Sequence, residues 1–135
     1  VLDIMGTDID ARMVEIAKEN AQKAGVASDI TFNQMRVQDL RSEKINGVII
    51  SNPPYGERLS DDAGVTKLYA EMGEVFEPLK TWSKFILTSD ENFEKKFGRQ
   101  ADKKRKLYNG TLKVDLYQFF GERVRRQATS EKGNI

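Results

Sequence analysis

The sequence of this 135-residue chain predicts an α/β fold whose twisted sheet is mostly parallel and ends in an antiparallel hairpin. In the first half, short apolar runs of strand length alternate with a segment whose apolar residues keep helical spacing, which is the pattern of strand–helix–strand units. Near the C-terminus, Asn109 and Gly110 separate two apolar runs, and this dipeptide is a strong signal for a hairpin turn. These patterns together predict parallel strands followed by an antiparallel pair.

The chain is expected to begin with a strand over residues 1–7, followed by a helix. Asp10 is well placed as the N-cap of this helix, because its side chain can accept a backbone N–H of the first turn. Gly25 supplies a stop signal, since glycine readily takes the left-handed conformation that ends many helices. Helical spacing is kept between these two signals by Val14, Ala17, Ala21 and Ala24.

Two further strands are expected before the middle of the chain. Residues 30–33 form a short strand, and a turn follows at residues 37–40. Residues 47–51 form an apolar run that stops at Asn52-Pro53-Pro54-Tyr55, so we expect a buried strand whose carboxyl end opens into a rigid polar turn. Residues 59–64 then form a polar loop that either covers a substrate or simply connects two elements.

The second half predicts two helices and three strands. An amphipathic helix begins at Val65, and its apolar stripe is interpreted as core: Leu68, Tyr69, Met72, Val75, Phe76 and Leu79. A strand over residues 84–88 and a short helix over residues 92–97, closed by Gly98, come next. The last strand is predicted to be half-buried, because apolar residues occupy alternate positions along it: Leu112, Val114 and Leu116.

Four consecutive cations precede the hairpin, namely Lys103, Lys104, Arg105 and Lys106. This run either holds phosphates or is a solvated approach to the strand. Residues 122–135 form a polar tail that we expect to be frayed, so residues 1–121 make up the folded domain.

Composition excludes several classes of function. The chain has no cysteine, which excludes disulfides and thiolate metal sites. It also has no histidine, which is the commonest metal ligand and the base of hydrolytic triads. We therefore expect no metal. No apolar run approaches the roughly 20 residues of a membrane span, so we expect no membrane partner, and the composition fits a cytoplasmic protein. The formal net charge is +1, so any contact with nucleic acid must come from local patches.

The turn Asn52-Pro53-Pro54-Tyr55 has the chemistry of an acceptor site for a flat amino group. The two prolines restrict the backbone of the turn, which leaves the Asn52 side chain little freedom. The Asn52 amide oxygen and the Pro53 carbonyl can each accept one N–H of a planar NH2 group, which aims its lone pair at a methyl sulfonium. Tyr55 can stack on the flat acceptor. The alternative is an ordinary proline turn at a strand end.

Three residues are candidates for binding a nucleoside cofactor. Asp8 lies at the tip of the first strand, where a carboxylate can accept both hydroxyls of a ribose, or can serve as a loop or cap residue. Ile9 can pack on an adenine ring. Asp39 can accept a hydrogen bond from an adenine amino group, or can stabilise the turn in which it lies.

Asn52-Pro53-Pro54-Tyr55 resembles the (Asn/Asp)-Pro-Pro-(Tyr/Phe) motif of S-adenosylmethionine-dependent amino methyltransferases. The succession of Asp8, Asp39 and this motif after three strands resembles class I methyltransferases, which have a Rossmann-like fold. More narrowly, residues 6–13, 52–59 and 106–112 resemble the bacterial RNA methylase family. This resemblance implies S-adenosyl-L-methionine as cofactor, with Asp8, Ile9, Asp39 and Asn52 as its contacts, and Asn52, Pro53, Pro54 and Tyr55 as the catalytic turn.

Members of this family join an RNA-binding THUMP domain to a methyltransferase domain, and they include 23S rRNA guanine-N2 methyltransferases. They are often labelled N6-adenine-specific DNA methylases. The resemblance therefore implies methylation of an exocyclic amino group of a nucleobase, with guanine N2 in 23S rRNA as the leading substrate. The alternatives are adenine N6 in DNA, a glutamine in a protein, and a non-catalytic RNA-binding module.

The chain also departs from the family pattern. The family's first strand, its glycine-rich cofactor loop and its THUMP domain would all precede Val1. Because that first strand is central, we expect a gap in the sheet with two unpaired strand edges. We therefore expect residues 1–121 to be a partial methyltransferase domain, which neither binds cofactor well nor turns over without the upstream part of the same protein.

Overall fold

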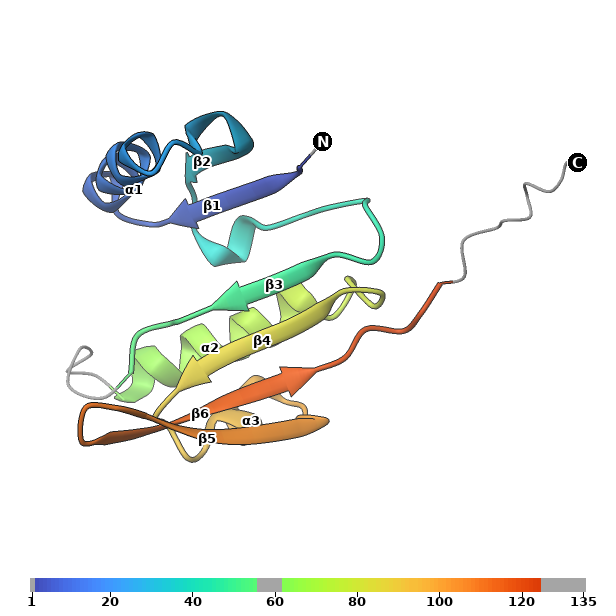
Figure 1. Cartoon of the computed structure of the whole chain (residues 1–135). Coiled ribbons are helices and arrows are strands. Elements are labelled where there is room, and N and C mark those ends of the chain that lie inside the picture. Colours follow the sequence, from blue (N-terminus) through green and yellow to red (C-terminus); the bar gives the residue numbers. More distant parts are fainter. Residues whose placement is uncertain (1, 56–61, 125–135) are drawn as a thin grey trace, which may run out of the picture. The chain divides into compact units, whose positions relative to one another are not determined.

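The structure, a computed structural model, describes residues 2–55 and 62–124. The chain divides into two compact units, Val1–Arg41 (unit 1) and Ser42–Ile135 (unit 2). Figure 1 shows that each unit combines strands with at least one helix, which confirms the expected α/β fold class. Among the described residues, no helix is both long enough and apolar enough to cross a bilayer.

Unit 1 is a strand–helix–strand element. Strand β1 (Ile4–Asp8) pairs in parallel with β2 (Ile30–Gln34), with Ile4 opposite Ile30. Both strands were predicted. Strand β1 begins three residues later and ends one residue later than expected, and β2 begins where expected and ends one residue later. Two short 3₁₀ turns flank β2, namely η1 (Ala27–Asp29) and η2 (Val37–Asp39).

Helix α1 (Ala11–Lys23) connects β1 to β2 and shows both predicted end signals. The Asp10 side chain accepts the Arg12 N–H at 2.8 Å, so Asp10 is the N-cap. Gly25, two residues past the helix, has a φ of 77°, a left-handed conformation that costs glycine little. Local sequence signals therefore set both ends of this helix.

Unit 2 contains a four-stranded sheet in the order β3-β4-β6-β5. Strands β3 and β4 are parallel, whereas β6 is antiparallel to both β4 and β5. This is the predicted parallel arrangement with a terminal antiparallel hairpin. The strands are Val48–Ser51 (β3), Ser83–Thr88 (β4), Lys103–Asn109 (β5) and Leu112–Phe119 (β6), and the helices are Asp62–Phe76 (α2) and Phe93–Phe97 (α3).

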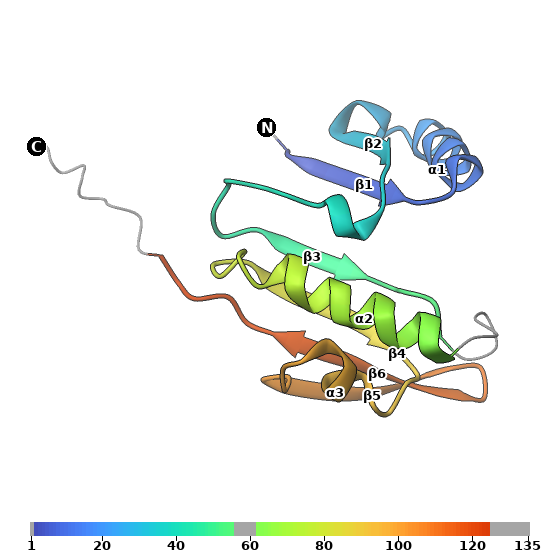
Figure 2. The ribbon, with the colours of Figure 1, turned by 180° about the vertical axis from the view of Figure 1, so that it is seen from behind.

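Helices α2 and α3 lie on one face of this sheet, which Figure 2 shows from behind. A cluster of aromatic rings between the helices and the sheet is centred on Phe93, which is fully buried. The centroid of its ring is 5.0 Å from that of Tyr69 on α2 and 4.8 Å from that of Tyr117 on β6. Each such pair contributes about 0.5–1.5 kcal/mol beyond the burial of its surface. The cluster therefore joins α2, α3 and β6.

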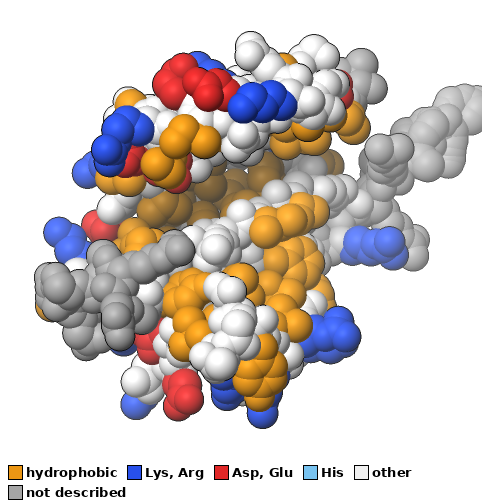
Figure 3. All heavy atoms as spheres, turned by 60° about the vertical axis from the view of Figure 1, so that its left-hand side comes forward, with side chains coloured by type: hydrophobic (Ala, Val, Ile, Leu, Met, Phe, Trp, Pro, Cys, Tyr) orange, Lys and Arg blue, Asp and Glu red, His pale blue; other side chains and the backbone are white. Residues whose placement is uncertain are grey.

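Strand β3 is not buried, contrary to the sequence prediction. Val48 and Ile50 are 59% and 81% exposed, whereas Ile49 and Ser51 are half-buried. Because side chains alternate across a sheet, Val48 and Ile50 point to the face that no helix of unit 2 covers among the described residues. Figure 3 shows hydrophobic side chains at the surface of this unit. A continuous apolar run therefore does not mean burial on both faces here.

Strand β6 also buries a different set of residues from the predicted one. Of the residues expected to face inward, Val114 is buried but Leu112 is 44% exposed. The side chains packed towards α2 and α3 are those of Asp115, Tyr117 and Phe119, which are at most 5% exposed. The Tyr117 hydroxyl donates to the Asp90 carbonyl inside the fold, whereas Asp115 lies 3.9 Å from Nζ of Lys113, whose side chain is 41% exposed.

One edge of β1 and one edge of β3 have no partner strand among the described residues. Each unit therefore presents a row of backbone N–H and C=O groups that another strand could pair with.

Gly73 on α2 lies against α3, and a Cβ atom at this position would overlap the Phe97 carbonyl oxygen. We expect Gly73→Ala to lower the free energy of unfolding by about 1–2 kcal/mol, because overpacking against a backbone atom outweighs the helix preference of alanine. Urea unfolding followed by the fluorescence of Trp82, the single tryptophan, measures this change. The exposed neighbour Glu74 supplies the control, since Glu74→Ala should stay within about 0.5 kcal/mol. A Gly73→Ala protein as stable as the parent would contradict the expectation.

Candidate active site

The turn Asn52-Pro53-Pro54-Tyr55 directly follows β3, at the carboxyl edge of the parallel strands β3 and β4. Ligands of open α/β sheets bind at this edge. Asn52 is exposed, Pro54 is half-buried, and Pro53 and Tyr55 are buried. Residues 56–59, which belong to the same sequence segment, lie outside the described residues. Asn52 is therefore open to solvent at the edge where the sequence predicts a substrate.

A tyrosine of α2 holds this turn in place. The Tyr69 hydroxyl donates a hydrogen bond of 2.7 Å to the Pro54 carbonyl, and it lies 3.0 Å from the Thr88 hydroxyl at the end of β4. Both Tyr69 and Thr88 are 0% exposed. The turn is thus tied to a helix and to the neighbouring strand by hydrogen bonds that are shielded from water.

Each hydroxyl in this chain of hydrogen bonds has a single hydrogen, and this fixes the direction of every bond. Tyr69 gives its hydrogen to Pro54, so the Thr88 hydroxyl donates to the Tyr69 oxygen. Thr88 Oγ1 accepts the Asp90 N–H at 3.1 Å. Burial raises the pKa of Tyr69 above its ordinary value, so the hydroxyl remains a donor at neutral pH.

Asp90 anchors the far end of the chain of hydrogen bonds. Its Oδ2 atom lies 2.6 Å from Lys96 Nζ, in an ion pair whose side chains are 13% and 16% exposed. Its Oδ1 atom accepts the Asn92 N–H at 2.8 Å, and its carbonyl accepts the Tyr117 hydroxyl at 3.1 Å. The polar network therefore extends from α3 and β6 through Thr88 to the turn.

The occupied Pro54 carbonyl leaves two other acceptors of the turn available. Within residues 2–55 and 62–124, no group hydrogen-bonds to the Asn52 side chain or to the Pro53 carbonyl. An amide oxygen and a backbone carbonyl that are adjacent in a restrained turn suit the two N–H groups of a planar amine. This arrangement can bind a flat NH2 group.

Tyr55 was predicted to stack on a flat acceptor, but its side chain is buried. It is 8% exposed, so little of its ring is open to solvent.

In unit 1, the residues predicted to bind the cofactor lie at the carboxyl ends of β1 and β2. Asp8 ends β1, and its Oδ1 atom accepts the Asp10 N–H at 2.8 Å, which is the loop role that the sequence left open. Ile9 is 65% exposed. Asp39 ends η2, and its carboxylate lies 3.5 Å from Arg36 Nε in an exposed ion pair. All three predicted side chains are therefore accessible.

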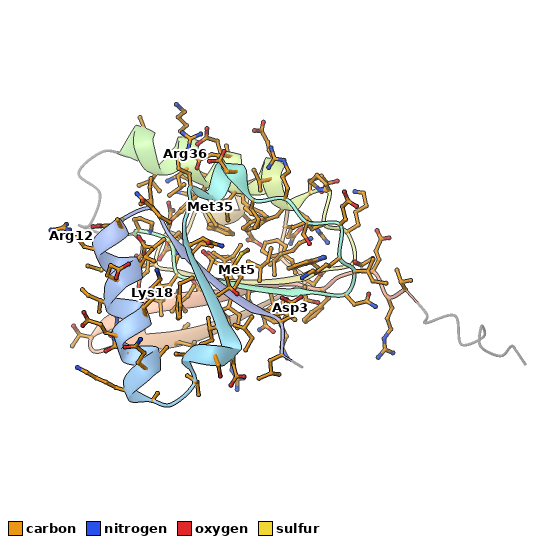
Figure 4. All side chains as sticks on the ribbon, turned by 90° about the horizontal axis from the view of Figure 1, so that it is seen from above. Asp3, Met5, Arg12, Lys18, Met35 and Arg36 are labelled. Atoms are coloured by element: carbon orange, nitrogen blue, oxygen red, sulfur yellow. The ribbon has the colours of Figure 1, made fainter. Side chains whose placement is uncertain are left out.

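These residues fit a nucleoside-containing cofactor. The second carboxylate oxygen of Asp8 has no hydrogen-bond partner among the described residues, so it can accept a ribose hydroxyl while the first keeps the loop closed. Ile9 exposes an apolar surface on which an adenine ring can pack. Figure 4 shows Arg12 at the start of α1 and Arg36 beyond β2. A hydrogen bond from Arg12 lowers the pKa of Asp10, which keeps the N-cap carboxylate charged.

The structure brings together the predicted residues within each unit, the turn in unit 2 and the acidic loops in unit 1. Sequence reasoning missed Tyr69 and Thr88 as site residues, because Tyr69 was interpreted as part of an apolar core stripe. The sequence did contain one signal for this contact: a tyrosine in a buried stripe needs a hydrogen-bond partner for its hydroxyl group. Helical spacing cannot tell which carbonyl that partner is. In the described part of the chain, no cluster of three or more acidic, cysteine or histidine side chains could hold a metal.

Comparison with known proteins identifies related sequences over most of the chain. Residues 1–118 match the family model described as RMKL-like, methyltransferase domain. The protein named "Putative RNA methyltransferase YpsC" of Bacillus subtilis (strain 168) is 54% identical over 129 residues, which are 95% of this chain and 34% of YpsC. Ribosomal RNA large subunit methyltransferase K/L of Legionella pneumophila is 37% identical over 115 residues, which are 84% of this chain and 16% of that protein. The chain thus spans about a third of YpsC and less of the K/L protein.

A solved structure supports the same relationship. The crystal structure of SMU.472, described as "a putative methyltransferase complexed with SAH", matches with a TM-score of 0.88 and 67% sequence identity, over 92% of this chain and 33% of that one. SAH is what remains of S-adenosylmethionine after methyl transfer, so this family binds that cofactor. The fold is the Rossmann-like fold of class I methyltransferases. This chain belongs to the RMKL-like methyltransferase domain family.

Proposed function

We propose that this chain carries the catalytic turn of an S-adenosylmethionine-dependent N-methyltransferase that acts on an exocyclic amino group of a nucleobase. One observation carries the proposal: the Asn52 amide and the Pro53 carbonyl are unpaired among the described residues, beside a Pro54 carbonyl that Tyr69 fixes. The favoured substrate is guanine N2 in 23S rRNA. The name of the K/L relative, ribosomal RNA large subunit methyltransferase, supports the RNA, and the family resemblance implies the guanine N2 atom.

The turn prepares a weak nucleophile. The nitrogen of an exocyclic amine shares its lone pair with the ring, so it attacks only when it becomes pyramidal. Asn52 Oδ1 and the Pro53 carbonyl each accept one N–H, which holds the nitrogen in that geometry and stabilises the positive charge that develops on it. The product ammonium readily loses its proton to water, so the absence of histidine is no obstacle.

The cofactor supplies a methyl group on a sulfonium. Asp8 accepts ribose hydroxyls, Ile9 packs on the adenine ring, and Asp39 accepts the adenine amino group. The exposed pair of Asp39 with Arg36 contributes little to stability and does not prevent this contact. Asn52 is the fourth member of this set, because the family resemblance implies that it contacts the cofactor as well as the amine.

Two further parts complete the site in this proposal. Tyr55 turns outward and stacks on a base that has left its helix. The upstream part of the same protein supplies a cofactor loop and a THUMP domain, consistent with relatives about three times as long as this chain. Recovery of the upstream coding sequence tests this partner, and an Asp/Glu-x-x-x-Gly-x-Gly segment before Val1 is the expected result.

The substrate can be identified by mass spectrometry of nucleosides from a strain that lacks the gene. Loss of N2-methylguanosine from 23S rRNA is the expected result. Loss of N6-methyladenine from DNA, which the same four-residue motif allows, would replace the favoured substrate. Loss of a methylglutamine in a protein would do the same.

Asn52→Ala should lower the kcat of methyl transfer by about 10²–10³-fold, because it removes an acceptor that stabilises charge in the transition state. Transfer of a labelled methyl group to rRNA measures the loss. Asn92, an exposed asparagine of the same unit, supplies the matched control Asn92→Ala, which should keep parental activity. Full activity in Asn52→Ala would favour a non-catalytic RNA-binding module instead.

Tyr69→Phe should reduce kcat by about 10- to 100-fold with little change in KM, because the Pro54 carbonyl loses the donor that fixes the turn. Its cost in stability should be about 1–2 kcal/mol. Tyr117→Phe is the matched control, since Tyr117 is equally buried and donates to the Asp90 carbonyl rather than to the turn. Equal losses of kcat in both variants would mean that Tyr69 has a structural role and no special link to the turn.

Asp8→Asn should weaken S-adenosylmethionine binding by about 10-fold, because it removes the charged acceptor for a ribose hydroxyl but keeps an oxygen for the Asp10 N–H. Calorimetric titration of the protein that includes the upstream part measures the dissociation constant, and the kcat values of the Asn52 and Tyr69 variants are measured on the same protein. Asp29→Asn, an exposed change in η1, is the control and should leave binding unchanged. Unchanged affinity in Asp8→Asn would exclude Asp8 from the cofactor site.

A further inference from the structure

Strand β5 is an outer strand of the unit 2 sheet, and it carries four consecutive cations that we name the basic edge: Lys103, Lys104, Arg105 and Lys106. Every residue of β5 is exposed. The sequence suggested that this run either holds phosphates or approaches the strand. The run lies inside the strand, so its backbone is held in a regular extended geometry.

Nearby carboxylates do not neutralise the basic edge. In the described ranges of the chain, none of its four side chains takes part in an ion pair. The acid opposite Lys106 is Asp115, which is 5% exposed and lies 3.9 Å from Lys113 Nζ. Lys104 Nζ lies 5.7 Å from the centroid of the Tyr117 ring, which is a neutral partner. The four positive charges are therefore available to an external anion.

The geometry of a strand spreads these charges along a line. Lys103 and Arg105 point to one face of the sheet, and Lys104 and Lys106 point to the other. Cations on the same face are about 6.8 Å apart along the strand. Such a row suits a linear polyanion better than a compact one.

The basic edge leads to the catalytic end of the sheet. Because β6 is antiparallel to β4, the hairpin turn at Gly110 and Thr111 lies at the same end of the sheet as the carboxyl end of β3, which Asn52 follows (Figure 1). Strand β5 is three strand spacings from β3, or about 14 Å. Tyr108, 66% exposed, stands between the basic edge and the hairpin turn and offers a ring on which a base can stack.

We infer that the basic edge binds the phosphodiester backbone of the nucleic acid whose base enters the Asn52 turn. This inference rests on the proposed function, since it assigns a path to the backbone of that substrate. Lysines on an exposed strand also discourage pairing with other sheets, but that role creates no affinity for nucleic acid. Backbone contacts do create such affinity, and they release counterions, so binding weakens as salt rises.

The test is binding of the 135-residue chain to a fluorescein-labelled single-stranded RNA of 12 nucleotides, followed by anisotropy at several salt concentrations without cofactor. Each phosphate contact contributes about 0.7 to the slope of log affinity against log salt. The double variants Lys103→Gln/Arg105→Gln and Lys104→Gln/Lys106→Gln should each lower the slope by about 1.4 and weaken binding about 10- to 30-fold at 0.1 M salt. The same titration is repeated with a single-stranded DNA of the same sequence. Equal slopes for RNA and DNA would mean that the basic edge binds the phosphates of either nucleic acid.

The matched control is Lys23→Gln/Lys95→Gln, which removes the same charge from exposed positions on α1 and α3 and should leave the slope unchanged. Parental slopes in both basic-edge variants, or no RNA binding by the parent chain, would overturn the inference. Equal binding of poly-glutamate would overturn it as well. The binding assay involves no methyl transfer, so its outcome is independent of the Asn52→Ala experiment. Loss of activity in Asn52→Ala without RNA binding at the basic edge would support the proposed function and overturn this inference. RNA binding at the basic edge with full activity in Asn52→Ala would do the reverse.

Discussion

The hydrogen bond from Tyr69 to the Pro54 carbonyl is the constraint on which the candidate site depends. It occupies one carbonyl of the turn and leaves the preceding one, that of Pro53, free. Prolines restrict the backbone angles of a turn but not its orientation relative to the rest of the protein. The tyrosine supplies that orientation, because its ring is packed against Phe93 at a centroid distance of 5.0 Å. The aromatic core therefore determines where a polar turn points.

The candidate chemistry is divided between the two units in a way that follows from their topology. Unit 1 offers carboxylates at the ends of two parallel strands, which suit the hydroxyls and amino group of a nucleoside. Unit 2 offers neutral acceptors in a restrained turn, which suit an amine that becomes positively charged. Both sets lie where strands end, and there a side chain can point into solvent without disrupting the pairing of the sheet. The antiparallel hairpin adds the basic edge to unit 2.

Local signals in the sequence predicted the elements well, because capping and turn residues act within a few positions. Asp10 and Gly98 serve as expected, and the predicted hairpin forms, although Asn109 is the last residue of β5 and the turn consists of Gly110 and Thr111. Burial was predicted less well, because it depends on which face other elements cover. The sequence could not reveal that Ile50 faces outward or that Asp115 faces inward. The site was anticipated through its motif residues, whereas the Tyr69 contact joins positions fifteen residues apart and has no local pattern.

The one-sided packing of β3 implies that its positions differ in their tolerance of mutation within this chain. Ile49 is half-buried, so a polar residue there would lose part of its contact with water, whereas Ile50 is 81% exposed and a threonine would meet mostly water. A saturation library across the strand should thus yield alternating intolerance with a period of two. The same library in a longer context would lose that alternation wherever another segment of polypeptide shields the outer positions.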